Sequence, residues 1–310
     1  MRLAKLALIA TLGLGTTGCI KSMLLKGQIQ GTRQASSAVD TLHDYEVARA
    51  AAYAGLAQFE GMHKLAPANV DALFLLTKGW AGATFAFTED EWEVHEDLKH
   101  KELAEYHRLR AIAGYERSIA YGLEMFSAMG KDGWADARKS PVAMTKWLKD
   151  SFTDKDDAAP LFWVGYAWLA KVNVNKEDPD TVADLWVAVA LLERSVELDR
   201  TYNFASGLTA LAAYHARTPM AELDEAKKLF DEAMALTGNK ALIQKVNYAT
   251  RYLCAKSDKD GYIKALQEVV DAGDLLPESR LTNVIGKRRA RRYLGKARMA
   301  DARENCAFPD

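Results

Sequence analysis

The sequence has little proline and almost no net charge. Only 7 of its 310 residues are proline, 49% are hydrophobic, and the formal net charge is −1 at pH 7. This composition excludes collagen-like and disordered chains, and it is sufficient for a large buried core. Without an excess of charge, the chain has no overall field that would favour nucleic acid or acidic substrates. We therefore expect a globular protein with no nucleic-acid partner.

Strand signals are also nearly absent. The long stretches rich in Ala, Leu, Glu and Lys favour helix, because these side chains lose little rotamer freedom in a helical backbone. Proline in the first turn marks several predicted helix starts. These starts are Ser140-Pro141, Asp178-Pro179, Thr218-Pro219 and Leu276-Pro277. The sequence predicts an all-α fold.

No apolar run is long enough to span a bilayer. The run near the N-terminus, residues 6–14, is well short of the ~20 residues that a transmembrane helix needs. It follows Arg2 and Lys5 and precedes small residues and Cys19, an order that resembles a bacterial lipoprotein signal peptide. We predict that residues 1–18 are the signal peptide and that Cys19 is lipidated. The alternative is an ordinary cleaved signal in which Cys19 has no role.

Lipidation predicts a location on the periplasmic face of the cell envelope. More than one acyl chain on Cys19 gives lasting membrane attachment, and the following Ile20 and Lys21 favour the outer membrane. We expect residues 19–40 to be a lipidated tether or a frayed helix. Residues 41–298 then form the folded domain, and residues 299–310 form a C-terminal tail.

Cysteine is scarce, with three residues in the whole chain. In an oxidising compartment Cys254 and Cys306 either form a disulfide or remain two unrelated thiols, and spacing alone does not decide between them. No C-x-x-C spacing occurs, so the cysteines do not indicate a metal site.

Internal similarity indicates a stacked array of helix pairs. Residues 188–198 and 226–236 share an apolar pattern at an offset of 38 positions, and the offset persists into the next helix. An earlier copy, over residues 59–75, lies 133 positions before the first of the two. The period exceeds the 34 residues of a tetratricopeptide repeat (TPR). We therefore predict a TPR-like solenoid of antiparallel helix pairs with a concave surface.

Four hydrophobic segments follow one another in a recognisable order: residues 53–87, 115–123, 160–179 and 281–290. Together they resemble the T component of TPR-associated TRAP transporters, the TatT family. The resemblance covers nearly the whole mature chain and implies a periplasmic lipoprotein that forms a small homo-oligomer. It also implies that the chain docks the substrate-binding P component, which delivers a hydrophobic or organic-acid ligand to the permease. The alternative is a generic TPR-like envelope lipoprotein that acts as a scaffold.

Aromatic residues are dense in two of these segments and predict a cavity between helix pairs. Trp163 and Tyr166 share one helical face, and Trp168 lies about 100° further round than that face. The predicted ligand-binding residues are Phe85, Phe87, Trp163, Tyr166, Trp168, Asn173 and Trp186. The alternative is plain core, because aromatic side chains at helical spacing usually pack.

An acidic stretch over residues 89–100 contains histidine. His95-Glu96 is followed by Lys99 where the zinc motif H-E-x-x-H requires histidine. Glu96, His100 and His107 can share a helical face, but charged helical runs are usually solvated and stabilised by pairs one turn apart. We therefore predict no metal site and no cofactor, and we expect an insertion loop or an extended hairpin end.

The strongest positive cluster lies in residues 287–292. Its predicted partner-binding residues are Arg288, Arg289, Arg291 and Arg292. Their charges would meet an acidic partner surface, anionic lipid headgroups or carboxylates within the chain. The alternative is a solvated C-terminal helix.

Signatures of catalysis are missing as well. The sequence has neither a serine nucleophile elbow nor a phosphate-binding G-K-[ST] loop. We therefore predict a binding protein and no enzymatic activity.

Overall fold

The computed structural model describes residues 22–217 and 221–308, apart from the side chains of residues 303 and 304. None of the described residues lies in a strand, which confirms the all-α class. The first half contains η1 (Ser36–Thr41), α2 (Tyr45–Leu65), α3 (Val70–Ala83), η2 (Thr84–Thr88), α4 (Glu89–Asp97), α5 (Lys101–Ala128), α6 (Trp134–Ala137), α7 (Pro141–Ser151) and η3 (Lys155–Asp157).

The second half continues the array of helices. Its elements are α8 (Ala158–Val174), α9 (Pro179–Ala183), α10 (Leu185–Leu198), α11 (Tyr202–Arg217), α12 (Leu223–Leu236), α13 (Leu242–Asn247), η4 (Tyr248–Leu253), α14 (Lys259–Asp271), η5 (Pro277–Ser279), α15 (Arg280–Tyr293) and α16 (Lys296–Asn305). No helix of the described residues is long and apolar enough to cross a membrane.

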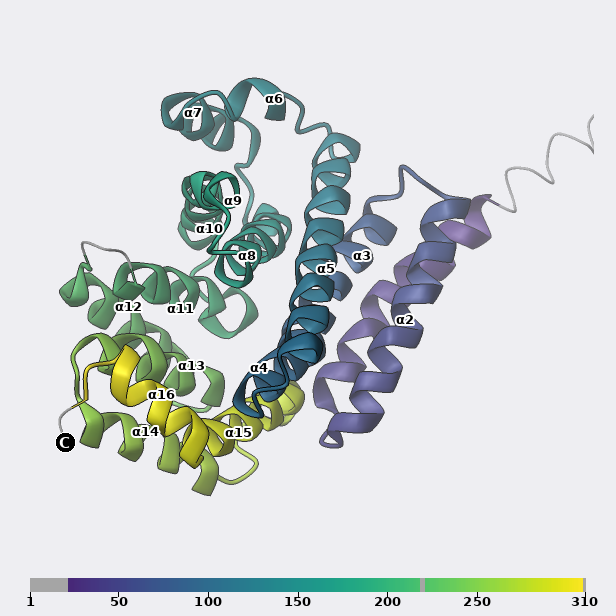
Figure 1. Ribbon diagram of the computed structural model, residues 1–310. Helices are drawn as coiled ribbons and strands as arrows, with labels where there is room; N and C mark the ends of the chain where they lie inside the picture. The colour runs from purple at the N-terminus through teal and green to yellow at the C-terminus, as the bar shows by residue number, and fades with distance from the viewer. Residues whose placement is uncertain (1–21, 218–220, 309–310) are drawn as a thin grey trace, which may run out of the picture.

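The 38-residue repeat is visible in the helix boundaries. Helices α10 and α12 start 38 residues apart and end 38 residues apart. Leu192 of α10 and its counterpart Phe230 of α12 are both fully buried. Helix α2 ends at Leu65, which is 133 residues before the end of α10. The predicted helix-pair repeat is therefore confirmed, and the chain stacks these pairs into a solenoid (Figure 1).

Proline marks helix starts as the sequence predicts. Helices α7 and α9 begin at Pro141 and Pro179, where the preceding Ser140 and Asp178 side chains accept hydrogen bonds from first-turn backbone N–H groups. Such caps satisfy donors that have no partner within the helix. The 3₁₀ turn η5 begins at Pro277. The predicted start at Thr218-Pro219 lies outside the described residues.

The described part of the expected tether is helical. Residues 22–35 form a helix that continues into η1. Ile29 is fully buried against Met62 and Ala72, and Arg33 pairs with Asp71. The packed part of the chain thus begins nearer to residue 22 than to residue 41.

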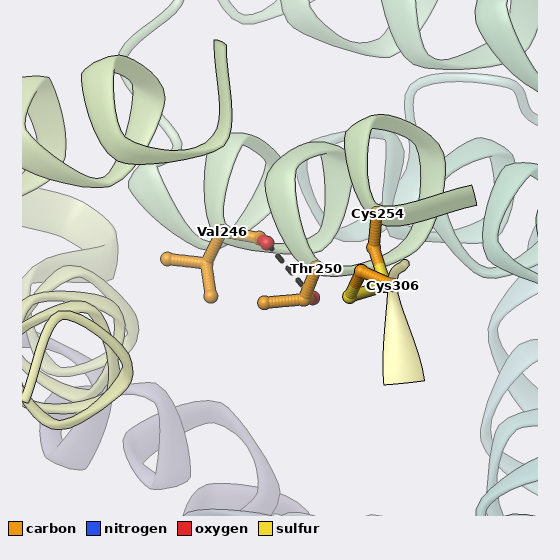
Figure 2. Close-up of a disulfide and its surroundings, with 4 residues drawn as sticks. All are labelled: Val246, Thr250, Cys254 and Cys306. Carbon is orange, nitrogen blue, oxygen red and sulfur yellow. Dashed lines mark hydrogen bonds between the residues drawn. A yellow bond between two sulfur atoms is a disulfide. The ribbon is translucent and has the colours of Figure 1, made fainter. Parts of the chain in front are cut away.

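A disulfide joins the C-terminal segment to the body of the protein. Cys254, at the end of η4, is bonded to Cys306, with 4.7 Å between the two Cα atoms (Figure 2). In the turn before Cys254, the Thr250 hydroxyl donates a 3.0 Å hydrogen bond to the carbonyl oxygen of Val246 (Figure 2). Phe308 is buried against Tyr262. The alternative that sequence spacing left open is resolved in favour of the disulfide, and residues up to 308 pack onto the domain.

The solenoid curves back on itself. Helix α15 packs against η1 and α2 and lies beside α4, so the C-terminal helices close onto the N-terminal ones (Figure 1).

The acidic stretch over residues 89–100 was expected to be an insertion loop or an extended hairpin end. The loop alternative is wrong, because residues 89–97 form helix α4 directly after the π-helical turn η2. The hairpin-end alternative agrees with the structure, because α4 leads through a short turn into α5 and packs against it.

Candidate functional site

A cavity of about 640 Å³ lies on the inner side of the closed array. Its lining comes from helices far apart in sequence, including α2, α3, α8, α11, α13 and α15. Most of the lining side chains are apolar. A cavity of this size and character matches sites that enclose a small organic ligand, which are typically about 300–1,000 Å³.

Five of the seven predicted ligand residues line this cavity: Phe85, Phe87, Trp163, Tyr166 and Asn173. Phe85 and Phe87 come from the π-helical turn η2, and such turns are frequent at functional sites. Phe85 and Tyr166 pack edge to face with ring centroids 5.9 Å apart. Trp163 is held by its indole N–H, which donates to the Tyr202 hydroxyl at 2.8 Å. The aromatic wall is therefore fixed by contacts among its own members.

The other two predicted residues do not reach the cavity. Trp168 packs against Trp134, with ring centroids 5.5 Å apart, and beneath the Arg138 guanidinium. It follows Tyr166 by two residues, which is about 200° around a helix, so the two side chains point to opposite sides. Trp186 packs against the main core. For Trp168 and Trp186 the ligand-binding prediction is corrected to the core alternative.

The backbone is strained where α11 begins. Asn203, Phe204 and Ala205 have φ values of 48°, 55° and 56°. Each non-glycine residue in this left-handed region costs on the order of 1–3 kcal/mol. Gln244 holds the segment by donating a 2.7 Å hydrogen bond to the carbonyl oxygen of Phe204. Asn203 and Phe204 both line the cavity, so the strained segment shapes its wall.

Three of the four predicted partner-binding arginines of α15 form ion pairs within the chain. Arg288 bonds Asp90 at 2.6 Å, and Arg292 bonds both Asp90 and Glu93. Arg289 is 5% exposed, lies 3.4 Å from Glu89 and donates to the carbonyl oxygen of Phe85. These three side chains are occupied by α4, which corrects their assignment to a partner surface. The intramolecular alternative accounts for them.

Arg291 differs from its neighbours. It is exposed and makes no ion pair with any described residue. Of the four predicted partner-binding arginines, it is therefore the one whose guanidinium is fully available on the surface.

The pKa values of two carboxylates in this network shift in opposite directions. Burial raises the pKa of Glu89, and the nearby Arg289 only partly opposes this. Burial also disfavours ionised Asp90, but Arg292 and Arg289 outweigh burial and hold the pKa of Asp90 below its usual range. Asp97 belongs to the same network, because it pairs with Arg292 and Arg298. Glu89, Glu93 and Asp97 are spaced four residues apart, which places three carboxylates on one helical face, and this spacing is the sequence signal that could have predicted the network.

One group of side chains has metal-ligating types. Glu91, His95 and His107 bring ligand atoms within 4.8 Å of one another. Arg49 donates to Glu91 at 2.8 Å, and Arg110 lies 3.3 Å from Nδ1 of His107. These two guanidinium groups would repel a cation at this position. The set also differs from Glu96, His100 and His107, which the sequence offered as sharing a face.

Comparison with known protein families identifies the family of the chain. No curated protein is significantly similar to the chain. The sequence profile of the TRAP transporter T-component family matches residues 41–300, a span that runs from α2 through α15 and includes the aromatic wall of the cavity. The family resemblance stated from the sequence is confirmed, and the chain belongs to the TRAP transporter T-component family, a transport-associated family.

Proposed function

We propose that this T component holds a hydrophobic ligand in its cavity and docks the substrate-binding P component of its transporter. The observation that carries the proposal is the cavity itself, with Phe85, Trp163 and Tyr166 forming one continuous aromatic wall. Burying apolar surface against such a wall stabilises a complex by roughly 25 cal/mol per Å². The strained start of α11 beside it supports a role beyond packing.

The cavity proposal is tested by comparing two tryptophans on α8. Trp163 lines the cavity, whereas Trp168 packs against Trp134, and both are nearly buried. Truncating either to Ala should cost about 3–5 kcal/mol of stability. Only Trp163→Ala should also weaken binding of the probe dodecan-1-ol per folded molecule, measured by calorimetric titration beside circular dichroism melts. Equal binding by Trp163→Ala and Trp168→Ala would show that the wall is plain core.

The proposed homo-oligomer is supported by an exposed apolar stripe on α5. Leu103, Tyr106 and Leu109 recur every three residues and are 46%, 56% and 53% exposed. Contiguous apolar surface of this kind marks interaction sites more often than isolated exposed residues do. Sedimentation of the mature chain should show an oligomer, and a monomer at all concentrations would contradict the proposal.

The remaining parts of the proposal concern place and partner. Cys19 lies outside the described residues. We propose that its lipidation holds the protein on the periplasmic face of the envelope, at the outer membrane. Cys19→Ala should then move the protein into the soluble periplasmic fraction.

The docking proposal predicts that the mature chain co-purifies with its own P component. Separation of the two proteins during purification at micromolar concentrations would contradict it.

A further inference from the structure

Three large apolar side chains near the start of the described chain are strongly exposed. Met23 and Leu24 lie in the first turn of the helix over residues 22–35 and are 73% and 68% exposed. Leu65, the last residue of α2, is 71% exposed. We call these three side chains the apolar tip. Single exposed apolar residues are ordinary, whereas a group of them in one place marks an interaction site.

The members of the apolar tip lie at the same end of the molecule. Leu25 and Ala66 both pack against the small core cluster that contains Ile29 and Met62. Leu25 precedes Ile29 by one helical turn, and Ala66 follows Met62 by one turn, so the start of the N-terminal helix lies beside the end of α2. Figure 1 shows the purple N-terminal helix starting beside the turn between α2 and α3.

Lysine side chains flank the apolar tip. Lys26 and Lys64 are both exposed, and neither forms an ion pair with a described residue. Residues 22–35 and 61–70 contain no Asp or Glu. The carboxylates of Asp71 and Glu124, which come near this end, lie beside Arg33 and His63. Apolar side chains with a rim of lysine are typical of surfaces that lie in the headgroup layer of a bilayer.

The predicted lipid anchor is close to the apolar tip along the chain. Two residues separate Cys19 from Ser22, where the described helix begins. Because an extended chain advances at most about 3.6 Å per residue, Cys19 lies within about 11 Å of Ser22. Acyl chains on Cys19 that enter a bilayer therefore hold the apolar tip at the surface of that bilayer.

The helix that carries Met23 and Leu24 is fixed to the body of the protein. Ile29 is fully buried, and the Arg33 guanidinium pairs with Asp71 and lies 4.1 Å from the centroid of the Phe74 ring. A membrane contact at the start of this helix therefore sets the orientation of the whole domain.

From this arrangement we infer that the apolar tip is a membrane-docking surface, which inserts into the headgroup layer of a phospholipid bilayer while Lys26 and Lys64 bind anionic lipid phosphates. The inference rests on the proposed lipidation of Cys19 for its location, and it adds a contact between the folded domain and the lipid. That contact alone is weak and reversible, since even a single myristoyl chain binds with an association constant of only about 10⁴ M⁻¹. Cys19→Ala protein therefore still leaves the membrane when the lipid is diluted.

The test measures vesicle binding without any acyl chain. The mature chain carrying Cys19→Ala is titrated with vesicles of equimolar phosphatidylethanolamine and phosphatidylglycerol at millimolar lipid, and the bound fraction is measured by flotation. Adding Met23→Ser/Leu24→Ser/Leu65→Ser should lower the partition coefficient at least about tenfold, because full burial of even one such side chain contributes about that factor or more.

A matched control replaces three exposed apolar residues outside the apolar tip. Val142→Ser/Leu236→Ser/Leu275→Ser, at positions 81%, 49% and 41% exposed, should bind the vesicles as the parent chain does. A third variant tests the charge. Lys26→Gln/Lys64→Gln should bind the anionic vesicles more weakly than the parent and bind pure phosphatidylcholine vesicles equally well. Circular dichroism confirms folding, which serine and glutamine at exposed positions should leave intact.

The inference is overturned if the parent does not bind at millimolar lipid, or if the tip variant and the control variant bind alike. A changed sedimentation coefficient of the tip variant with unchanged vesicle binding would instead assign the apolar tip to a contact between copies of the chain. Because none of these proteins is acylated, the outcomes do not depend on the lipidation of Cys19. Cell fractionation of the Cys19→Ala variant tests lipidation separately.

Discussion

Arg289 and Arg292 on α15 form ion pairs with carboxylates of α4, whereas Arg217 and Arg251, which line the cavity, form no ion pair with a described residue. The first group closes the solenoid by joining its C-terminal helices to its N-terminal ones. The second group adds charge to a wall that is otherwise apolar. These arginines therefore differ in their surroundings: Arg289 and Arg292 join two parts of the array, whereas Arg217 and Arg251 make no ion pair with a described residue.

The largest effect is expected where a closing ion pair is broken. Arg292→Ala leaves Asp90 and Glu93 buried without their main partner, and removing one side of a buried pair typically costs about 3–5 kcal/mol. Urea unfolding followed by circular dichroism measures this loss. The control Arg291→Ala, one residue earlier and exposed, should stay within about 0.5 kcal/mol of the wild type. Equal stability of the two variants would show that the α4–α15 contact does not hold the array closed.

Acid should weaken the same contact. The folded-state pKa of Asp90 and of Glu93 is lowered, with the α15 arginines outweighing burial. A lowered carboxyl pKa contributes stability at neutral pH that is lost as pH falls through the folded-state value, which lies below the ordinary value of the carboxyl group. Glu89, whose pKa is raised, acts in the opposite direction. Stability measured from pH 7 to pH 3 should therefore fall in the wild type and fall less in Arg292→Ala. An identical pH dependence in both proteins would contradict this assignment.

The smallest effect is expected at the cavity. Arg217 makes no ion pair within the described chain and sits near another cation, so Arg217→Ala should leave the free energy of unfolding within about 0.5 kcal/mol or raise it slightly. The measurement is the same urea titration. A loss of unfolding free energy comparable with that of Arg292→Ala would mean that Arg217 has a structural anion partner. That result would contradict the distinction between the paired arginines of α15 and the arginines of the cavity lining.

Local structure could be predicted from the sequence to a large extent. Helix ends and the 38-residue repeat follow from apolar periodicity, proline and capping residues, all of which act over a few positions. Face assignments within α8 were also accessible, since Trp163 and Tyr166 share a side and Trp168 does not. The prediction nevertheless included Trp168 of α8 and Trp186 of α10, because the sequence does not show which side of either helix encloses the cavity.

Long-range pairing was not accessible in the same way. Arg292 and Asp90 are 202 residues apart, and they meet only because the solenoid curves back on itself. That curvature sums small rotations between successive helix pairs, and a single sequence does not reveal them. For the same reason the α15 arginines were read as a partner surface, and Arg217 and Arg251, with no local motif around them, were not singled out.

A crystal structure of the mature chain with bound dodecan-1-ol tests the central claim most directly. The account predicts that the alkyl chain lies in the cavity, along Trp163 and Tyr166. It would be contradicted by a cavity that stays empty at saturating dodecan-1-ol, or by an alcohol bound elsewhere on the protein.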